Sequence, residues 1–83
     1  MIGQEVVVDL RSPFVCLGTL KRIDADWLEL RDADLHDLRD TQTSRENYVA
    51  ASYTTGIKRN RKKVLVARGD IVAIARLEDF VDE

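Results

Sequence analysis

The chain has 83 residues, of which 45% are hydrophobic and 34% are charged. A chain of this length buries only about 60–65% of the surface that it exposes when unfolded, so its core is modest. These figures predict a single domain over residues 1–83 and exclude a large enzyme with separate cofactor and substrate domains. Thirteen basic and fifteen acidic residues give a net charge of −2, which for the whole chain argues against a general polyanion binder.

The charges are unevenly distributed along the chain. Residues 1–30 and 31–46 each carry a net charge of −2, residues 47–69 carry +6 without any acidic residue, and residues 70–83 carry −4. The sequence therefore separates a basic block from an acidic end, and the net charge conceals this separation.

The sequence carries no sign of export or of membrane insertion. Its one cysteine, Cys16, cannot form an internal disulfide, and the acidic residues near the N-terminus argue against a signal peptide. No apolar run approaches the roughly 20 residues that a membrane span needs. We therefore expect a cytoplasmic protein. Because it has neither a disulfide nor a metal motif, association with copies of itself is a natural source of stability.

Two strands are predicted at the start of the chain. Residues 6–10 alternate so that Val6, Val8 and Leu10 share one face, and Arg11-Ser12-Pro13 has the composition of a turn. The second strand spans residues 14–20, with Cys16 on its apolar face. Gly18 in the middle of that strand predicts a sharp bend or a close backbone approach.

A third strand is predicted after a turn at Asp24-Ala25-Asp26. In residues 27–30 the alternation points Leu28 and Leu30 inward and Glu29 outward. Three strands joined by tight turns within thirty residues predict an antiparallel meander.

A long, charged excursion separates this meander from the rest, and we place it at residues 31–63. Thr43 and Glu46 are spaced as a capping box, and Gly56 suits the position just past a helix end. These signals predict a short helix over residues 44–55, with Tyr48 and Tyr53 packing on the barrel, although the Tyr and Thr content also suits an extended hairpin arm.

Two closing strands are predicted at residues 64–66 and 71–74, joined by the tight junction Arg68-Gly69-Asp70. Residues 76–83 form an acidic tail with one helical turn. Five strands arranged as a meander, an excursion and a closing pair predict an all-β fold, a small antiparallel barrel in which closure removes exposed strand edges.

Two segments resemble the sequence motifs of the Sm and Sm-like proteins. Cys16-x-Gly18-x-Leu20-x-x-Ile23-Asp24, within residues 4–30, is similar to the first motif. The second motif resembles residues 64–75, in which Arg68-Gly69-Asp70 stands between two apolar strands. The two motifs occur in the family's order and together cover about half of the chain.

The resemblance implies a function and a set of site residues. In that family the last two strands lie at open edges and pair with neighbouring subunits, giving a ring of five to eight copies that binds single-stranded, often uridine-rich, RNA. Arg68, Gly69 and Asp70 match the base-contacting motif, and Asp24 matches an acid that supports the facing turn through hydrogen bonds.

The chain departs from the family pattern in three respects. The turn before Trp27 lacks the family's base-contacting Asn and is one residue shorter, so Trp27 or Asp26 occupies that region. No N-terminal helix precedes the first strand, and the connection between the motifs is about 33 residues long. Trp27 is interpreted either as an anchor at a subunit contact or as a platform on which a base stacks.

Other residues have alternative interpretations. The basic run suggests phosphate contacts or a solvated loop; it consists of Lys58, Arg59, Arg61, Lys62 and Lys63. His36 lies among Asp34, Asp37 and Asp40, which suggests a solvated stretch in preference to a metal site. Cys16 is expected to be buried and inert.

No catalytic constellation or cofactor motif is present in the sequence, so we expect a protein that is not an enzyme and binds no cofactor. The main hypothesis is a ring-forming, RNA-binding Sm-like protein. The alternative is a scaffold ring that binds a protein partner through residues 31–63 without affinity for RNA. A poorer third hypothesis is a small-molecule or metal-binding module at the acidic stretch.

Overall fold

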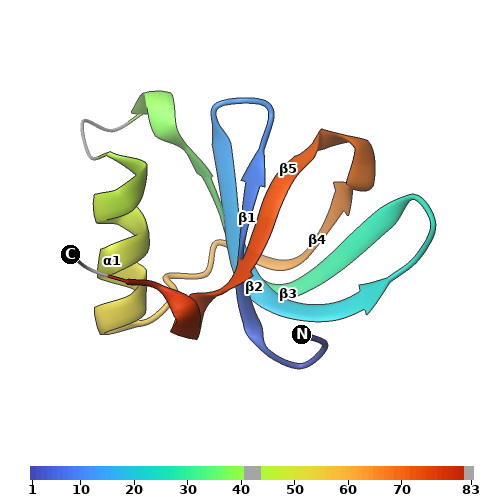
Figure 1. Cartoon of the computed structure of the whole chain (residues 1–83), viewed down its shortest axis with the longest axis horizontal. Helices are drawn as coiled ribbons and strands as arrows, with labels where there is room; N and C mark the ends of the chain where they lie inside the picture. The colour runs from blue at the N-terminus through green and yellow to red at the C-terminus, as the bar shows by residue number, and fades with distance from the viewer. Residues whose placement is uncertain (41–43, 82–83) are drawn as a thin grey trace.

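Five antiparallel strands form one curved sheet in the order β4-β3-β2-β1-β5, with a helix on its outer face (Figure 1). A computed structural model describes residues 1–40 and 44–81. The strands are β1 (Glu5–Leu10), β2 (Phe14–Ile23), β3 (Trp27–Asp37), β4 (Arg61–Ala67) and β5 (Ile71–Arg76), and the helix is α1 (Arg45–Thr55). Three short 3₁₀ turns complete the described chain: η1 (Leu38–Asp40), η2 (Arg68–Asp70) and η3 (Leu77–Asp79). The predicted five-stranded antiparallel barrel is confirmed, but the prediction that closure removes its strand edges was wrong, because β4 and β5 do not pair with each other over the described ranges.

The two edges of the sheet are β4 and β5. They run in opposite directions and are joined by η2 (Figure 1). In the described residues neither strand pairs with the other, so each leaves one row of backbone groups free. Free edges of this kind can pair with another chain.

Gly18 lies where β2 and β3 approach closely, as predicted. A Cβ atom added at this position would stand 2.9 Å from Ala33 Cβ and 3.1 Å from the Arg31 carbonyl oxygen. The pairing register of the two strands shifts at the same place, between Leu17 and Thr19. Only a residue without a side chain fits this contact, because Ala33 and its backbone cannot yield without moving the strand.

The interior of the barrel is filled by apolar side chains from β1, β2, β3 and β4. Its buried members are Val6, Val8, Leu10, Cys16, Leu20, Leu28, Leu30, Ala33 and Val66. Burial raises the pKa of the Cys16 thiol to about 11, and the nearby Asp34 carboxyl adds to this rise. Cys16 therefore stays protonated and unreactive at neutral pH, and its predicted place in the core is confirmed.

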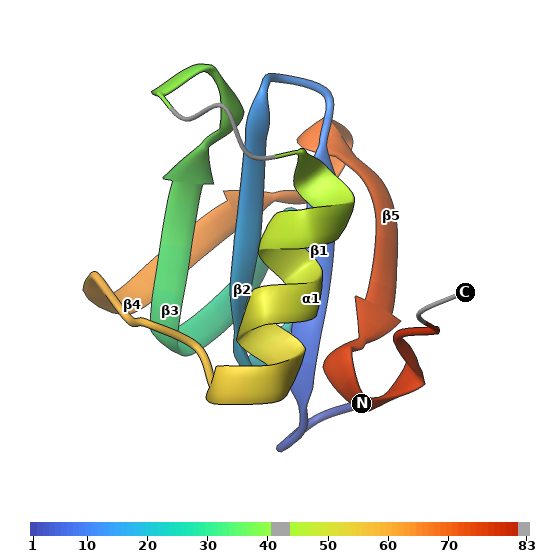
Figure 2. The same ribbon diagram turned by 90° about the vertical axis from the view of Figure 1, so that its left-hand side faces the viewer.

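A second apolar cluster lies on the opposite face of the sheet, beneath α1. Figure 2 shows α1 lying across β1 and β2. The buried residues of this outer layer are Val7, Val15, Leu17, Val49 and Leu77. Leu77 belongs to η3, so the helical turn predicted in the tail is confirmed and packs with α1 on the sheet.

The strands are longer than predicted, which shortens the excursion. β3 continues through Asp37, and β4 already begins at Arg61. Glu29 points outward, as predicted, although it is only 5% exposed. Arg31 at 2.6 Å and Arg22 at 3.5 Å cover its carboxylate on the outer face.

The predicted helix is confirmed, and the hairpin-arm alternative was wrong. Ser44 is the N-cap, and its hydroxyl accepts a hydrogen bond from the Asn47 backbone N–H at 3.2 Å. Thr43, the predicted cap, lies outside the described residues. Gly56 ends the helix with a φ of +93°, a conformation that favours glycine.

The aromatic side chains of the excursion only partly match expectation. Tyr48 packs against the outer layer, but Tyr53 is 51% exposed. His36 is half-buried and stacks on Tyr48 with ring centroids 3.9 Å apart, so the prediction of a solvated histidine was wrong. None of the described helices is long and apolar enough to span a membrane.

Candidate nucleic-acid interface

The turn between β2 and β3 is built around the carboxylate of Asp24. One of its oxygens accepts hydrogen bonds from the backbone N–H of Trp27 at 2.8 Å and of Asp26 at 3.1 Å. These two bonds, led by the one from Trp27, lower the pKa of Asp24 below its usual value. The backbone N–H of Asp24 in turn donates to the Trp27 carbonyl. The turn is therefore fixed by its own polar groups and sets the position of Trp27.

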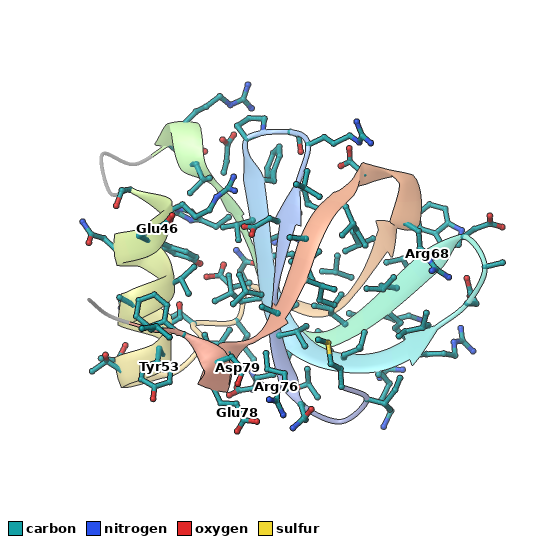
Figure 3. All side chains as sticks on the ribbon, in the orientation of Figure 1. Glu46, Tyr53, Arg68, Arg76, Glu78 and Asp79 are labelled. Atoms are coloured by element: carbon teal, nitrogen blue, oxygen red, sulfur yellow. The ribbon has the colours of Figure 1, made fainter. Side chains whose placement is uncertain are left out.

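Arg68 joins this turn to the junction between β4 and β5. Its backbone N–H donates to the Asp26 carbonyl at 2.9 Å, and its guanidinium Nη1 donates to the Asp24 carbonyl at 2.8 Å. Trp27 pairs with Ala67, the residue before Arg68. Figure 3 shows Arg68 beside the tip of the β2–β3 turn, at the side of the molecule away from α1. Three predicted site residues, Asp24, Trp27 and Arg68, thus lie together.

Gly69 and Asp70 face the other side of the junction. The Asp70 carbonyl accepts a hydrogen bond from the backbone N–H of Arg11 at 2.8 Å, and the Gly69 carbonyl accepts one from Arg11 Nε at 3.1 Å. The sequence assigned Arg11 to a turn and missed this contact. The signal that could have found it is the pairing of β1 with β5, which brings the end of β1 to the start of β5.

Trp27 is 45% exposed and borders an apolar groove. The groove has a volume of about 310 Å³ and runs along β4, where Val64 and Val66 line it. The indole therefore has one side toward the protein and a free area toward solvent. The arrangement offers a flat aromatic surface and a guanidinium from adjacent elements, which are the groups that hold a base and a phosphate.

The basic run lies elsewhere. Lys58, Arg59, Arg61, Lys62 and Lys63 occupy the start of β4 and the segment before it, whereas Arg68 follows the end of that strand. Six steps along a strand separate the two ends by about 20 Å. Arg59 also bonds Asp32 at 2.7 Å, and Lys63 lies 4.0 Å from Glu29. The structure does not bring these residues to Arg68.

The acidic stretch around His36 does not form a metal centre. In the part of the chain that the structure describes, no three His, Cys, Asp or Glu side chains are grouped closely enough to hold an ion. Asp37 instead bonds Arg39, whose guanidinium lowers the pKa of that carboxyl.

The side chains at the turn that holds Asp24, Trp27 and Arg68 can bind a ligand by stacking, charge and hydrogen bonds.

The fold is similar to that of a known protein structure. A Pyrococcus abyssii Sm protein in complex with a uridine heptamer matches 90% of this chain and 84% of its own, with a TM-score of 0.61 and 18% sequence identity. Comparison by sequence matches no family model and no curated protein. At this identity the likeness establishes the fold. The chain has an Sm-like fold.

Proposed function

We propose that copies of this chain pair through β4 and β5 into a ring of five to eight subunits that binds single-stranded, uridine-rich RNA without catalysis. One observation carries the proposal: the hydrogen bonds of Arg68 to Asp24 and Asp26 hold its guanidinium at the turn that carries the exposed indole of Trp27. The likeness to an Sm protein in complex with a uridine heptamer supports the ligand class.

The free sheet edges support assembly. Both carry large apolar side chains exposed in the single subunit: Leu65 of β4 is 48% exposed and Val72 of β5 is 67% exposed. Burying such side chains between subunits contributes about 25 cal/mol per Å² of apolar surface. Pairing of the backbone edges would also satisfy the free N–H and carbonyl groups.

The residues of the site would divide the work of binding. Trp27 stacks on a base, Arg68 supplies positive charge, and Asp24 holds the turn that carries Trp27. A methyl group added at Gly69 would meet no protein atom within 4 Å. Open space at Gly69 fits close approach of a ligand to the Gly69–Asp70 backbone. Repetition around a ring would convert a weak contact in each subunit into high avidity.

The test is a titration of fluorescently labelled oligouridine against the assembled protein at low salt. Base–aromatic stacking is worth about 1–3 kcal/mol per base, which corresponds to a loss of about 5- to 150-fold in affinity for Trp27→Ala. Arg68→Ala should weaken binding and flatten its salt dependence. Trp27 is the sole tryptophan, so quenching of its fluorescence reports stacking directly.

Arg39→Ala is the matched control for Arg68→Ala. Arg39 is an exposed arginine in η1 that pairs with Asp37 and lies away from Trp27, so its loss should leave RNA affinity unchanged. A ring that does not bind oligouridine at low salt would disprove the RNA-binding part of the proposal. That result would favour a scaffold ring that binds a protein partner.

A further inference from the structure

A cleft of about 350 Å³ opens on the outer face of the sheet, between α1 and the C-terminal turn η3. Glu46 lines it from the first turn of α1, and Asp79 lines it from η3. Ala75 of β5 also lines the cleft, and its short side chain leaves the space unfilled. Figure 3 shows Arg76, Glu78 and Asp79 gathered where β5 ends.

The charges in and beside this cleft are predominantly negative. Arg45 lies 3.2 Å from Asp9 and balances it. Arg76 is shared between two carboxylates, Asp79 at 2.9 Å and Glu78 at 3.2 Å. Glu46 has no cationic partner within residues 1–40 and 44–81. Four carboxylates therefore face two guanidinium groups, a net charge of −2.

The other edge of the sheet carries the opposite charge on the same outer face. Along β4 the side chains of Val64 and Val66 point into the barrel, so Lys63 points outward. Arg61 begins the strand opposite Ala33 and is exposed. Lys63 and two arginines, Arg22 and Arg31, surround the single carboxylate of Glu29. Among the described residues Arg61 meets no carboxylate. With Arg61, these side chains give the start of β4 and its neighbours a net charge of +3.

The directions of the two edge strands determine which end of β4 meets which end of β5 of the neighbouring subunit in a ring. β4 runs toward η2 and β5 runs away from it (Figure 1). A neighbour related by the modest rotation of a ring keeps these directions, so β4 of one subunit lies antiparallel to β5 of the next. The start of β4, with Arg61 and Lys63, then meets the end of β5 and the cleft beside it.

We propose that the exposed cations at the start of β4, Arg61 and Lys63, dock into the cleft between α1 and η3 of the neighbouring subunit, with Glu46 and Asp79 as their partners. This inference rests on the proposed ring and gives the basic run a role between subunits. It also assigns a purpose to α1, since the helix supplies one wall of the cleft and Glu46. Exposed ion pairs are individually weak, but this one recurs at every interface and favours the correct register.

The test measures the concentration at which the ring dissociates, by sedimentation velocity over a dilution series at low and high salt. Arg61→Glu and Glu46→Lys should each raise that concentration by about tenfold or more at low salt. The matched control is Lys62→Glu, a charge reversal on the same strand at a residue that alternation points away from the face of Lys63, which should leave assembly unchanged. Arg61 and Glu46 are both exposed, so the variants should remain folded, and circular dichroism checks this.

Mixing the two variants shows whether the contact is between subunits. Where β4 of an Arg61→Glu subunit meets the cleft of a Glu46→Lys subunit, the two reversed charges are again of opposite sign. Where the two subunits meet the other way round, both Arg61 and Glu46 are native. The two variants can alternate throughout a ring with an even number of subunits, whereas a ring with an odd number keeps one mismatched interface. The mixture should therefore assemble at a lower concentration than either variant alone.

The outcomes separate this inference from the proposed function. A wild-type chain that stays monomeric at high concentration overturns the ring itself. A wild-type ring whose stability is unaffected by both reversals overturns the docking contact and leaves the ring standing. If Arg61→Glu weakens oligouridine binding but not assembly, the start of β4 contacts RNA phosphates and the inference is wrong.

Discussion

The two faces of the sheet are both covered, but by layers of different chemistry. The barrel interior contains only apolar side chains among its buried residues. The outer layer, formed by α1 and η3 on β1 and β2, also buries the polar residues Asp34 and Ser52. The inner layer is formed by the strands alone, whereas the outer layer adds Val49 of the excursion and Leu77 of the tail to residues of β1 and β2. The second core is therefore chemically less uniform than the first.

The polar groups of the outer layer are incompletely paired. Asp34 accepts a hydrogen bond from the side chain of Asn60 at 3.0 Å. The hydroxyl of Tyr48 and the Nε2 atom of His36 are buried without a hydrogen-bond partner in the described residues. An unsatisfied buried polar atom costs about 1–3 kcal/mol. We therefore expect the outer layer to contribute less net stability per buried residue than the inner one.

The largest expected change in the free energy of unfolding comes from truncating a buried leucine in either layer. Leu17 of the outer layer and Leu30 of the inner layer are both 0% exposed. Each Leu→Ala change should lower the free energy of unfolding by about 2–5 kcal/mol, measured by urea denaturation. If both layers unfold as one unit, the two variants lose similar amounts in a single transition. A loss below about 1 kcal/mol for Leu17→Ala would show that the helix is not tightly packed on the sheet.

Leu65→Ala serves as the control for this pair. Leu65 is 48% exposed in the subunit, so its truncation should change the unfolding of a dissociated subunit by less than either core variant. Any larger effect at high protein concentration would reflect loss of assembly.

A smaller effect is expected from the cap of α1. Ser44→Ala removes the acceptor for the Asn47 N–H and should cost about 1 kcal/mol. The same measurement should show Ser44→Asp close to wild type, because aspartate also accepts that bond. Amide exchange should rise in α1 and remain low in β1 and β2 if the outer layer opens before the inner one. Equal rises in both regions would contradict the distinction between the layers.

The inner layer was predictable because its signals are local and repeated. Alternation assigned Val6, Val8 and Leu10 to one face, and Gly18 marked the close approach to β3. The same two strands, β1 and β2, also indicate the outer layer, because Val7, Val15 and Leu17 make the apolar run of each strand nearly continuous. Such runs are typical of strands covered on both faces. Packing of Tyr48 on the barrel was predicted, but the residues of β1 and β2 that lie beneath α1 were not.

The candidate site was predictable in part for a related reason. Asp24 and Arg68 were found through motifs, but their contact is made by backbone carbonyls, which carry no sequence signal. Arg11 was missed because its role depends on the pairing of β1 with the distant β5. The basic run was adjacent to Arg68 in sequence, yet the length of β4 places it at the opposite end of the strand.

The smallest expected effect concerns the buried carboxyl of the outer layer. Burial raises the pKa of Asp34 above its ordinary value, although the nearby His36 opposes the rise. The folded state therefore binds the proton more tightly than the unfolded state, and this group lowers stability as the pH rises through the acid range. Asp34→Asn keeps an acceptor for Asn60 and removes the charge. As the pH rises from about 4 to about 7, the free energy of unfolding of this variant should therefore increase relative to that of wild type.

Asp24→Asn provides a control of opposite sign. The pKa of Asp24 is lowered, because its charged form accepts the Trp27 and Asp26 backbone bonds. Its contribution to the free energy of unfolding is complete above the ordinary aspartate pKa and is lost as the pH falls through the lowered pKa. Asp24→Asn should therefore be less stable than wild type above about pH 4 and approach it at lower pH. Urea denaturation at several pH values measures both differences. A fall in the free energy of unfolding of Asp34→Asn relative to wild type as the pH rises would contradict the prediction. It would show that the outer layer stabilises the charged Asp34 carboxylate.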